Sequence, residues 1–283
     1  MRNISGSTIL LAALATLSLP AAAETISVKS SETALKLSQD WASGHGSKHP
    51  GTKIEVSGGS VTNAFAALAE KRIQLAAVPR VMRFKEAQAC EAALGQRPTE
   101  FKLAVNAVAI YVNANNPVKY LTYDELEAIF QGKRRNWQKL GGNNSPVIAF
   151  GVEASTPVGE LFVEEVLAGK GFTNDVKVVS PAELLKAIAR EPNSIGFGPL
   201  AQADGVRVVE IKRAFSSTPV APNEETISNR TYPISRFVYG YADPAVIKDG
   251  LKAYLDWIRG EEGQQIARQA GYFPIAAKWR TTP

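Results

Sequence analysis

The chain has 283 residues, of which 45% are hydrophobic and 21% charged, and a formal net charge of +5. That length allows one large domain or two of ordinary size, each with its own core. The positive excess is small and its runs of basic residues are short, which argues against a nucleic-acid binder. The single cysteine, Cys90, excludes an internal disulfide, and we expect it to be packed in a helix over Phe84–Leu94.

Residues 1–23 have the pattern of a cleaved signal peptide. Arg2 supplies the positive charge, Ile9–Leu19 is apolar, and small residues at Ala21–Ala23 precede Glu24. The apolar stretch is too short to span a membrane, and no later run reaches the roughly 18 apolar residues of a spanning helix. We therefore expect an exported, periplasmic protein that is not embedded in the membrane.

The residues that follow alternate between strand-like and helix-like patterns. Strands are expected at Thr25–Val28, Lys53–Val56 and Ile73–Val78, with helices at Thr33–Ser43 and Ala64–Glu70 between them. This βαβαβ order is typical of a parallel, doubly wound sheet. In such sheets, ligands bind beyond the carboxyl ends of the strands.

Two long apolar strands, Leu103–Val112 and Ile234–Tyr241, separate a second set of alternating elements. The elements expected between and after them are a helix from Thr122 to Phe130, strand Val147–Phe150, helix Val158–Leu167, strand Val176–Val179, helix Pro181–Arg190, strands Ser194–Phe197 and Arg207–Ile211, a loop-rich stretch at Ala214–Thr231, and helices Pro244–Ile258 and Gly263–Gln269. This order predicts two α/β lobes, and the chain passes from one lobe to the other twice. A ligand groove is expected where the lobes meet. Residues 24–107 plus 235–283 would form lobe 1 and residues 108–234 lobe 2.

Three times a strand leads through a turn rich in Ser and Thr into a helix. The turns are Ser30–Thr33, Ser57–Thr62 and Ala154–Pro157. The start of a helix has unpaired N–H groups and partial positive charge, so it can bind an anion. Hydroxyl groups there cap the helix and can also donate hydrogen bonds to ligand oxygens. Three such turns in an exported α/β chain favour a receptor for a small oxyanion.

Several segments resemble the PstS-like substrate-binding proteins of phosphate ABC transporters, which have the type II periplasmic binding fold. The most specific segment is Asn113–Trp137, with its Asn-Asn-Pro-Val, Leu-Thr and Ile-Phe-Gln-Gly-Lys motifs. The other matching segments are Ser30–Thr33, His49–Ser60, Ser194–Gly198, Tyr232–Arg236, Gly263–Ile266 and Gly271–Tyr272. Together they cover nearly the whole chain that follows the predicted signal peptide.

The resemblance implies a two-lobed α/β fold in which each lobe is a doubly wound, mainly parallel sheet flanked by helices. It also implies a monomeric receptor that binds a small oxyanion, phosphate above all, between the lobes and delivers it to an ABC transporter permease. It predicts no enzymatic activity, cofactor or metal. The ligand-binding residues expected from the turns and the resemblance are Ser31, Glu32, Thr33, Ser60, Val61, Thr62, Arg80, Ser155 and Thr156.

The turns also depart from the family pattern. The third turn has no Arg, and Pro157 lacks an N–H group to donate. Arg80 is the candidate replacement cation, although a salt bridge at the edge of a lobe explains it equally well. Glu32 would repel an oxyanion unless it is protonated or paired. These departures predict weaker phosphate binding and support an alternative function, a non-transport sensor, adhesin or envelope scaffold with the same fold.

The sequence contains only two histidines, His45 and His49, four residues apart. That spacing suits a pair of metal ligands on a helix. Gly44, Gly46 and Pro50 instead predict a loop with both histidines exposed. The chain also lacks the Gly-x-Ser-x-Gly motif of a serine hydrolase, so a hydrolase that uses the groove is the weakest functional hypothesis.

Overall fold

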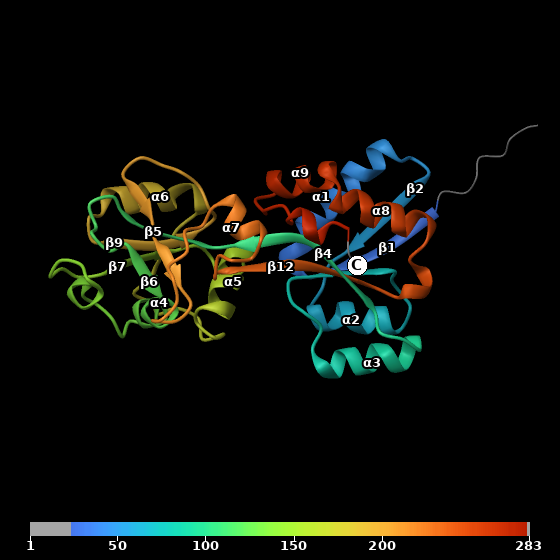
Figure 1. Ribbon diagram of the computed structural model, residues 1–283, viewed down its shortest axis with the longest axis horizontal. Coiled ribbons are helices and arrows are strands. Elements are labelled where there is room, and N and C mark those ends of the chain that lie inside the picture. Colours follow the sequence, from blue (N-terminus) through green and yellow to red (C-terminus); the bar gives the residue numbers. More distant parts are fainter. Residues whose placement is uncertain (1–23, 282–283) are drawn as a thin grey trace, which may run out of the picture.

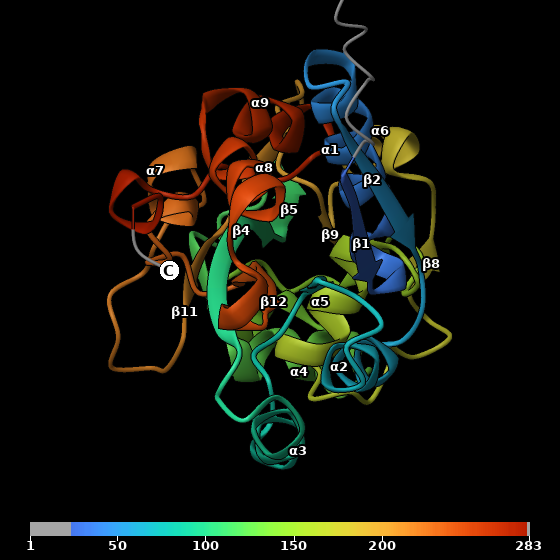
Figure 2. The ribbon, with the colours of Figure 1, turned by 90° about the vertical axis from the view of Figure 1, so that its right-hand side faces the viewer.

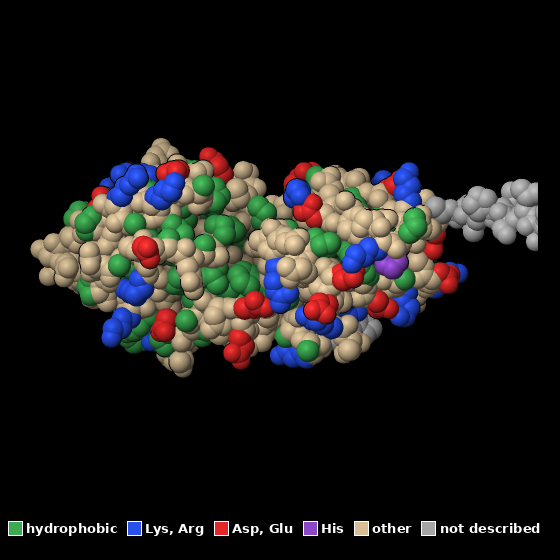
Figure 3. Space-filling view, turned by 90° about the horizontal axis from the view of Figure 1, so that it is seen from above, with side chains coloured by type: hydrophobic (Ala, Val, Ile, Leu, Met, Phe, Trp, Pro, Cys, Tyr) green, Lys and Arg blue, Asp and Glu red, His purple; other side chains and the backbone are tan. Residues whose placement is uncertain are grey.

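The computed structural model describes residues 24–281, so the predicted signal peptide lies outside the described residues. Two α/β lobes lie side by side, and the long strands β4 (Thr99–Ala107) and β12 (Ser235–Ala242) extend toward the junction between them (Figure 1). Viewed from above, the molecular surface is indented where the lobes meet (Figure 3). Within residues 24–281, no helix is long and apolar enough to cross a membrane.

The sheet of the first lobe has the strand order β2-β1-β3-β12-β4. Its other strands are β1 (Glu24–Ser30), β2 (Thr52–Ser57) and β3 (Leu75–Val78). Strand β1 is parallel to both β2 and β3, while β12 is antiparallel to β3 and β4. Because β4 therefore runs in the same direction as β3, the carboxyl ends of β1, β2, β3 and β4 all reach one edge of the sheet. We call this the carboxyl edge.

Helices cover both faces of this sheet (Figures 1 and 2). They are α1 (Glu32–Lys48), α8 (Asp249–Arg259) and α9 (Glu261–Gln269) on one face, and α2 (Val61–Ala69) and α3 (Phe84–Leu94) on the other. On the α2 and α3 face, Cys90 is buried and its Sγ lies 3.6 Å from the carbonyl oxygen of Phe65. The prediction that Cys90 is packed in a helix is confirmed.

The second lobe has its own sheet, with the order β10-β5-β9-β7-β8. Its strands are β5 (Ala109–Asn113), β7 (Ile148–Gly151), β8 (Lys177–Val178), β9 (Ser194–Gly198) and β10 (Val206–Val208). A separate parallel pair joins β6 (Tyr120–Thr122) to β11 (Glu210–Lys212). The helices are α4 (Tyr123–Phe130), α5 (Pro157–Glu165), α6 (Pro181–Arg190) and α7 (Glu224–Ser228). Short 3-10 helices occupy Trp137–Leu140, Pro244–Val246 and Ala277–Trp279.

Two predicted strands are each divided between two sheets. The apolar run Leu103–Val112 is β4 in the first lobe and β5 in the second, with Val108 between them, and the run Arg207–Ile211 is β10 and β11. The N–H group of Val108 donates to the carbonyl oxygen of Ile234, where the two crossing segments meet. Every residue from Leu103 to Val112 is buried, so the apolar pattern gave no sign of the change of sheet.

The predicted loop around His45 is wrong. Helix α1 continues through Gly44 and Gly46 to Lys48, and His45 is buried. A Cβ atom at Gly44 would lie 2.3 Å from Cδ1 of Ile266, so this glycine allows α9 to pack closely on α1. Burial against α9 thus outweighs the roughly 1 kcal/mol that glycine costs inside a helix. Helix α7, in the stretch expected to be loop-rich, was also missed.

Candidate functional site

The first two Ser/Thr turns lie together at the carboxyl edge. The N–H group of Ser31 donates to the carbonyl oxygen of Ala77 at the end of β3, at 3.0 Å. The N–H group of Glu32 donates to the carbonyl oxygen of Gly59, at 3.1 Å. These bonds join the turn after β1 to the turn after β2, so two of the three predicted anion-binding turns are adjacent in the fold.

Both turns are capped by serine hydroxyl groups. Ser31 Oγ accepts from the N–H group of Ala34 at 3.3 Å, and Ser60 Oγ accepts from Asn63 at 3.1 Å. Capping uses these oxygens as acceptors, so it does not use the hydroxyl protons. The hydroxyl oxygens of Ser31 and Thr33 lie 3.4 Å apart. The predicted Val61 and Thr62 begin helix α2, where first-turn N–H groups have no partner within the helix.

Two charged side chains lie over the second turn. Lys29 Nζ donates to the carbonyl oxygen of Gly58 at 3.1 Å. The Glu32 side chain also reaches Gly58, because one carboxylate oxygen is 3.2 Å from the position that a Cβ atom would occupy there. Glu32 is exposed and forms no ion pair with any residue in the described part of the chain. Sequence reasoning missed Lys29, because a lysine on a strand suggests an ordinary solvated side chain.

The third turn has a different hydrogen-bonding pattern. Thr156, rather than Ser155, caps α5: its Oγ1 accepts from the N–H group of Gly159 at 3.0 Å and donates to the carbonyl oxygen of Glu153 at 2.7 Å. Ser155 is exposed. Pro157 occupies the first helical position. The hydroxyl proton of Thr156 is therefore already used within the turn.

The buried Asn106 connects this third turn to the first lobe. Asn106, near the end of β4, donates through Nδ2 to the carbonyl oxygen of Pro157 at 2.8 Å. Helices α1 and α5 also come within 8 Å of each other, Cα to Cα. The third turn thus lies near the carboxyl edge, but no direct hydrogen bond joins its predicted residues to those of the other two turns. Sequence reasoning did not identify Asn106 because its partner is 51 residues away.

Arg80 follows the end of β3 but is bound to a carboxylate. Its Nη1 and Nη2 each donate to Glu86 at 2.7 Å, and its guanidinium lies 5.5 Å from the ring centroid of Phe65. This hydrogen bonding holds the pKa of the Glu86 carboxyl below its usual range. Arg80 and Glu86 thus form the salt bridge at the lobe edge that was the alternative explanation for this arginine.

A charged cavity of about 390 Å³ lies between the lobes beside Arg80. It is lined by Pro79, Arg80, Val81, Arg83, Glu164, Glu165, Gly169, Arg230, Arg236 and Tyr239. The buried Arg236 of β12 donates to Glu164 of α5 and lies 3.5 Å from Glu160, while its Nε has no hydrogen-bond partner. Burial lowers the pKa of the Arg230 guanidinium. The ion pair of Arg236 thus links the two lobes at this cavity.

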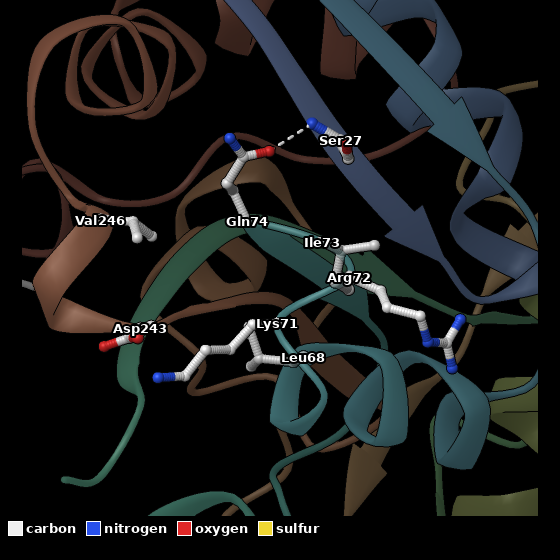
Figure 4. Close-up of a pocket in the computed structure, with 8 residues that line it drawn as sticks. All are labelled: Ser27, Leu68, Lys71, Arg72, Ile73, Gln74, Asp243 and Val246. Carbon is white, nitrogen blue, oxygen red and sulfur yellow. Dashed lines mark hydrogen bonds between the residues drawn. The ribbon is translucent and has the colours of Figure 1, made fainter. Parts of the chain in front are cut away.

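A smaller cavity of about 300 Å³ lies elsewhere in the first lobe (Figure 4). At this cavity, Gln74 Oε1 accepts from the N–H group of Ser27 at 2.6 Å, and Lys71 extends toward Asp243. Gln74 precedes β3, so the cavity is near the amino end of that strand and away from the carboxyl edge. It contains none of the predicted ligand-binding residues.

Comparison with known proteins identifies the family. Residues 17–262 match the model of the PBP superfamily domain. The phosphate-binding protein PstS of Pseudomonas aeruginosa is 31% identical over 265 residues, covering 88% of this chain and 82% of PstS. PstS of Bacillus subtilis is 26% identical over 230 residues, covering 81% and 73% of the two chains. A possible phosphate-binding protein from Planctomyces limnophilus superposes with a TM-score of 0.80, at 23% identity, over 92% of this chain and 96% of that chain.

The fold and these matches define a solute-binding receptor of the two-lobed α/β type. The chain belongs to the PBP superfamily and is a PstS-like substrate-binding protein. The predicted family and fold class are confirmed. The family consists of binding receptors rather than enzymes, which agrees with the predicted lack of catalytic function.

Proposed function

We propose that this protein is exported to the periplasm, binds inorganic phosphate between its lobes and delivers it to an ABC transporter permease. The observation that carries the proposal is the hydrogen-bonded pair of turns at the carboxyl edge, with Ser31 and Ser60 at the starts of two helices. The relatives that are named phosphate-binding proteins support it. The proposed lobe boundaries, residues 24–107 with 235–283 and residues 108–234, put both chain crossings beside this edge. We also propose that the receptor is a monomer.

Within this proposal, the first lobe supplies most of the binding interactions. The hydroxyl groups of Ser31 and Ser60 donate to phosphate oxygens, together with N–H groups in the first turns of α1 and α2. Lys29 contributes positive charge near the second turn. The proposed ligand-binding residues remain Ser31, Glu32, Thr33, Ser60, Val61, Thr62, Arg80, Ser155 and Thr156.

The proposal gives Glu32 a role that is compatible with its negative charge. Phosphate retains a proton at neutral pH, and a carboxylate can accept a hydrogen bond from that proton. Sulfate has no such proton, so the same carboxylate would repel it. Glu32 would then favour phosphate over sulfate and molybdate.

Isothermal titration calorimetry of the purified chain tests this function. We expect saturable heat with phosphate and little with sulfate, molybdate or small organic acids. The double variant Ser31→Ala with Ser60→Ala should lose most of the phosphate affinity. Heat from none of these ligands would contradict the proposal, as would equal affinity for phosphate and sulfate. Sequencing the amino terminus of the exported protein would test cleavage before Glu24.

A further inference from the structure

The two histidines lie at the carboxyl end of α1, opposite the end that carries Ser31. The N–H group of His49 donates to the carbonyl oxygen of His45 at 2.9 Å, so the helical hydrogen-bond pattern continues to His49. The two rings stack with their centroids 4.3 Å apart and an interplanar angle of 26°. The pair therefore has the one-face arrangement that the predicted loop would have prevented.

His45 is buried, but its polar groups are not fully used. Only 2% of the residue is exposed, and its Nδ1 has no hydrogen-bond partner. Its ring meets Tyr254 and Trp257 of α8 edge-on, at centroid distances of 5.0 and 5.3 Å. Burial and the neighbouring His49 lower the pKa of His45, which favours the neutral imidazole. Neutral imidazole is the form that binds metal ions.

The surroundings of the pair are compatible with a cation. Carbonyl groups at the end of α1 carry partial negative charge. Glu262 of α9 pairs with Lys48 at 2.5 Å and also accepts from Trp257 Nε1 at 2.7 Å, so the positive charge of Lys48 is balanced nearby. His49 is exposed and gives access from solvent. Residues 24–281 contain no group of three or more His, Cys, Asp or Glu side chains placed to hold a metal, so water must complete any coordination.

We propose that His45 and His49 form a two-histidine site for a divalent late transition-metal ion, such as Cu²⁺ or Zn²⁺. Histidines four residues apart on one helix face are a standard pair of metal ligands. Imidazole nitrogen suits copper, nickel and zinc, and Cu²⁺ binds such sites more tightly than Zn²⁺. The site is independent of the proposed phosphate site, because it uses the opposite end of α1.

Copper titration of the full chain without a histidine tag tests the proposal. Trp257 lies beside His45, so bound Cu²⁺ should quench its fluorescence. We expect saturable quenching with one ion per chain at pH 7.5, and weaker Zn²⁺ binding by calorimetry. Trp257→Phe should remove most of the quenching while leaving the calorimetric binding of Zn²⁺.

The variant His49→Ala is the main control, because His49 is exposed and its loss should not affect folding. It should lose the saturable quenching, while Lys48→Ala, next to it on the surface, should keep it. His45→Asn, checked for folding by circular dichroism, should also lose it. Undiminished quenching in His49→Ala, or no saturable binding of either ion, would overturn the proposal. Phosphate affinity should be the same in His49→Ala, and a change in it would contradict the independence of the two sites.

Discussion

The turns of the first lobe and the turn of the second lobe have similar sequences but offer different hydrogen-bonding groups. Ser31 and Ser60 cap their helices as acceptors, and neither hydroxyl group donates to a backbone carbonyl of its own turn; Ser31 Oγ lies 3.4 Å from Thr33 Oγ1. Thr156 caps α5 in the same way but donates its proton to Glu153, and Pro157 has no N–H group. A Ser or Thr at a helix start therefore does not by itself provide a ligand donor. Whether the hydroxyl group can donate to a ligand depends on whether its proton is already used within the turn.

This difference should be visible in the energetics of phosphate binding. Neutral hydrogen bonds contribute about 0.5–1.5 kcal/mol each, and bonds to charged groups about 1.5–3 kcal/mol. The first lobe offers the hydroxyl groups of Ser31 and Ser60, the first-turn N–H groups of Val61 and Thr62 in α2, and Lys29. In the third turn, the proton of Thr156 is used and the carbonyl group of Pro157 is bound by Asn106. We therefore expect the first lobe to supply most of the affinity.

The largest expected effect is on stability, and it comes from removing Arg236, whose ion pair joins the two lobes. Arg236→Ala leaves Glu160 and Glu164 without their buried partner, which should lower the free energy of unfolding by about 3 kcal/mol. Urea unfolding measures this loss. Lys252→Ala removes the partner of an exposed pair with Asp256, so it should cost less than about 1 kcal/mol. Equal losses in the two variants would show that the pair of Arg236 does not stabilise the fold.

The next largest effect compares two caps directly. Ser31→Ala and Thr156→Ala each remove a cap, so each should lower stability by about 0.5–2 kcal/mol. Only Ser31→Ala removes a hydroxyl group that we propose to donate to phosphate, so only it should weaken phosphate binding by about 1.5–3 kcal/mol, tenfold or more in Kd. Calorimetry of both variants with phosphate provides the comparison. If Thr156→Ala weakened binding as much as Ser31→Ala, the two regions would contribute equally.

A substitution in the third turn should reduce the difference between the two lobes in their contributions to phosphate affinity. Glu153 is exposed, and Glu153→Arg replaces a negative charge in that turn with a positive one. Phosphate affinity should then rise by about 1 kcal/mol at low salt and return toward the original value near 1 M salt. Glu153→Gln should give a smaller gain. Unchanged affinity in both variants would indicate that the third turn does not approach the bound anion.

The smallest effect concerns the salt bridge of Arg80. The pKa of Glu86 is lowered in the folded protein, chiefly by its hydrogen bond to Arg80. The unfolded chain therefore binds a proton more readily, and this part of the stability is present near neutral pH but lost on acidification through the folded pKa. Urea unfolding at pH 7 and pH 4 should show a larger loss in the wild type than in Glu86→Gln. Identical losses of stability in the wild type and in Glu86→Gln would contradict the conclusion that the Arg80–Glu86 pair stabilises the fold.

The sequence predicted those features that depend on neighbouring residues. The bounds of α3 and α6 agree with the structure, and the caps at Ser31 and Ser60 follow from local turn chemistry. The alternation from β1 to β3 predicted the parallel strands whose carboxyl ends form the carboxyl edge. The family resemblance extended this local information to the fold as a whole.

The features that were missed depend on distant partners. Gly44 lies within a helix because Ile266 packs against it, and Asn106 matters because of the carbonyl group of Pro157. Lys29 reaches the second turn only when β1 and β2 lie side by side. The hydrogen bonds of Arg80 to Glu86, six residues further on, also could not be told from the sequence. Each of these contacts requires the folded arrangement, so the sequence pattern alone did not reveal it.

A crystal structure of the protein grown with phosphate tests the central claim most directly. We predict that the anion lies at the carboxyl edge, with its shortest hydrogen bonds from Ser31, Ser60 and the first-turn amides of α1 and α2. The second lobe should contribute fewer bonds. Phosphate bound mainly by residues of the third turn, or in a cavity away from the carboxyl edge, would contradict the account.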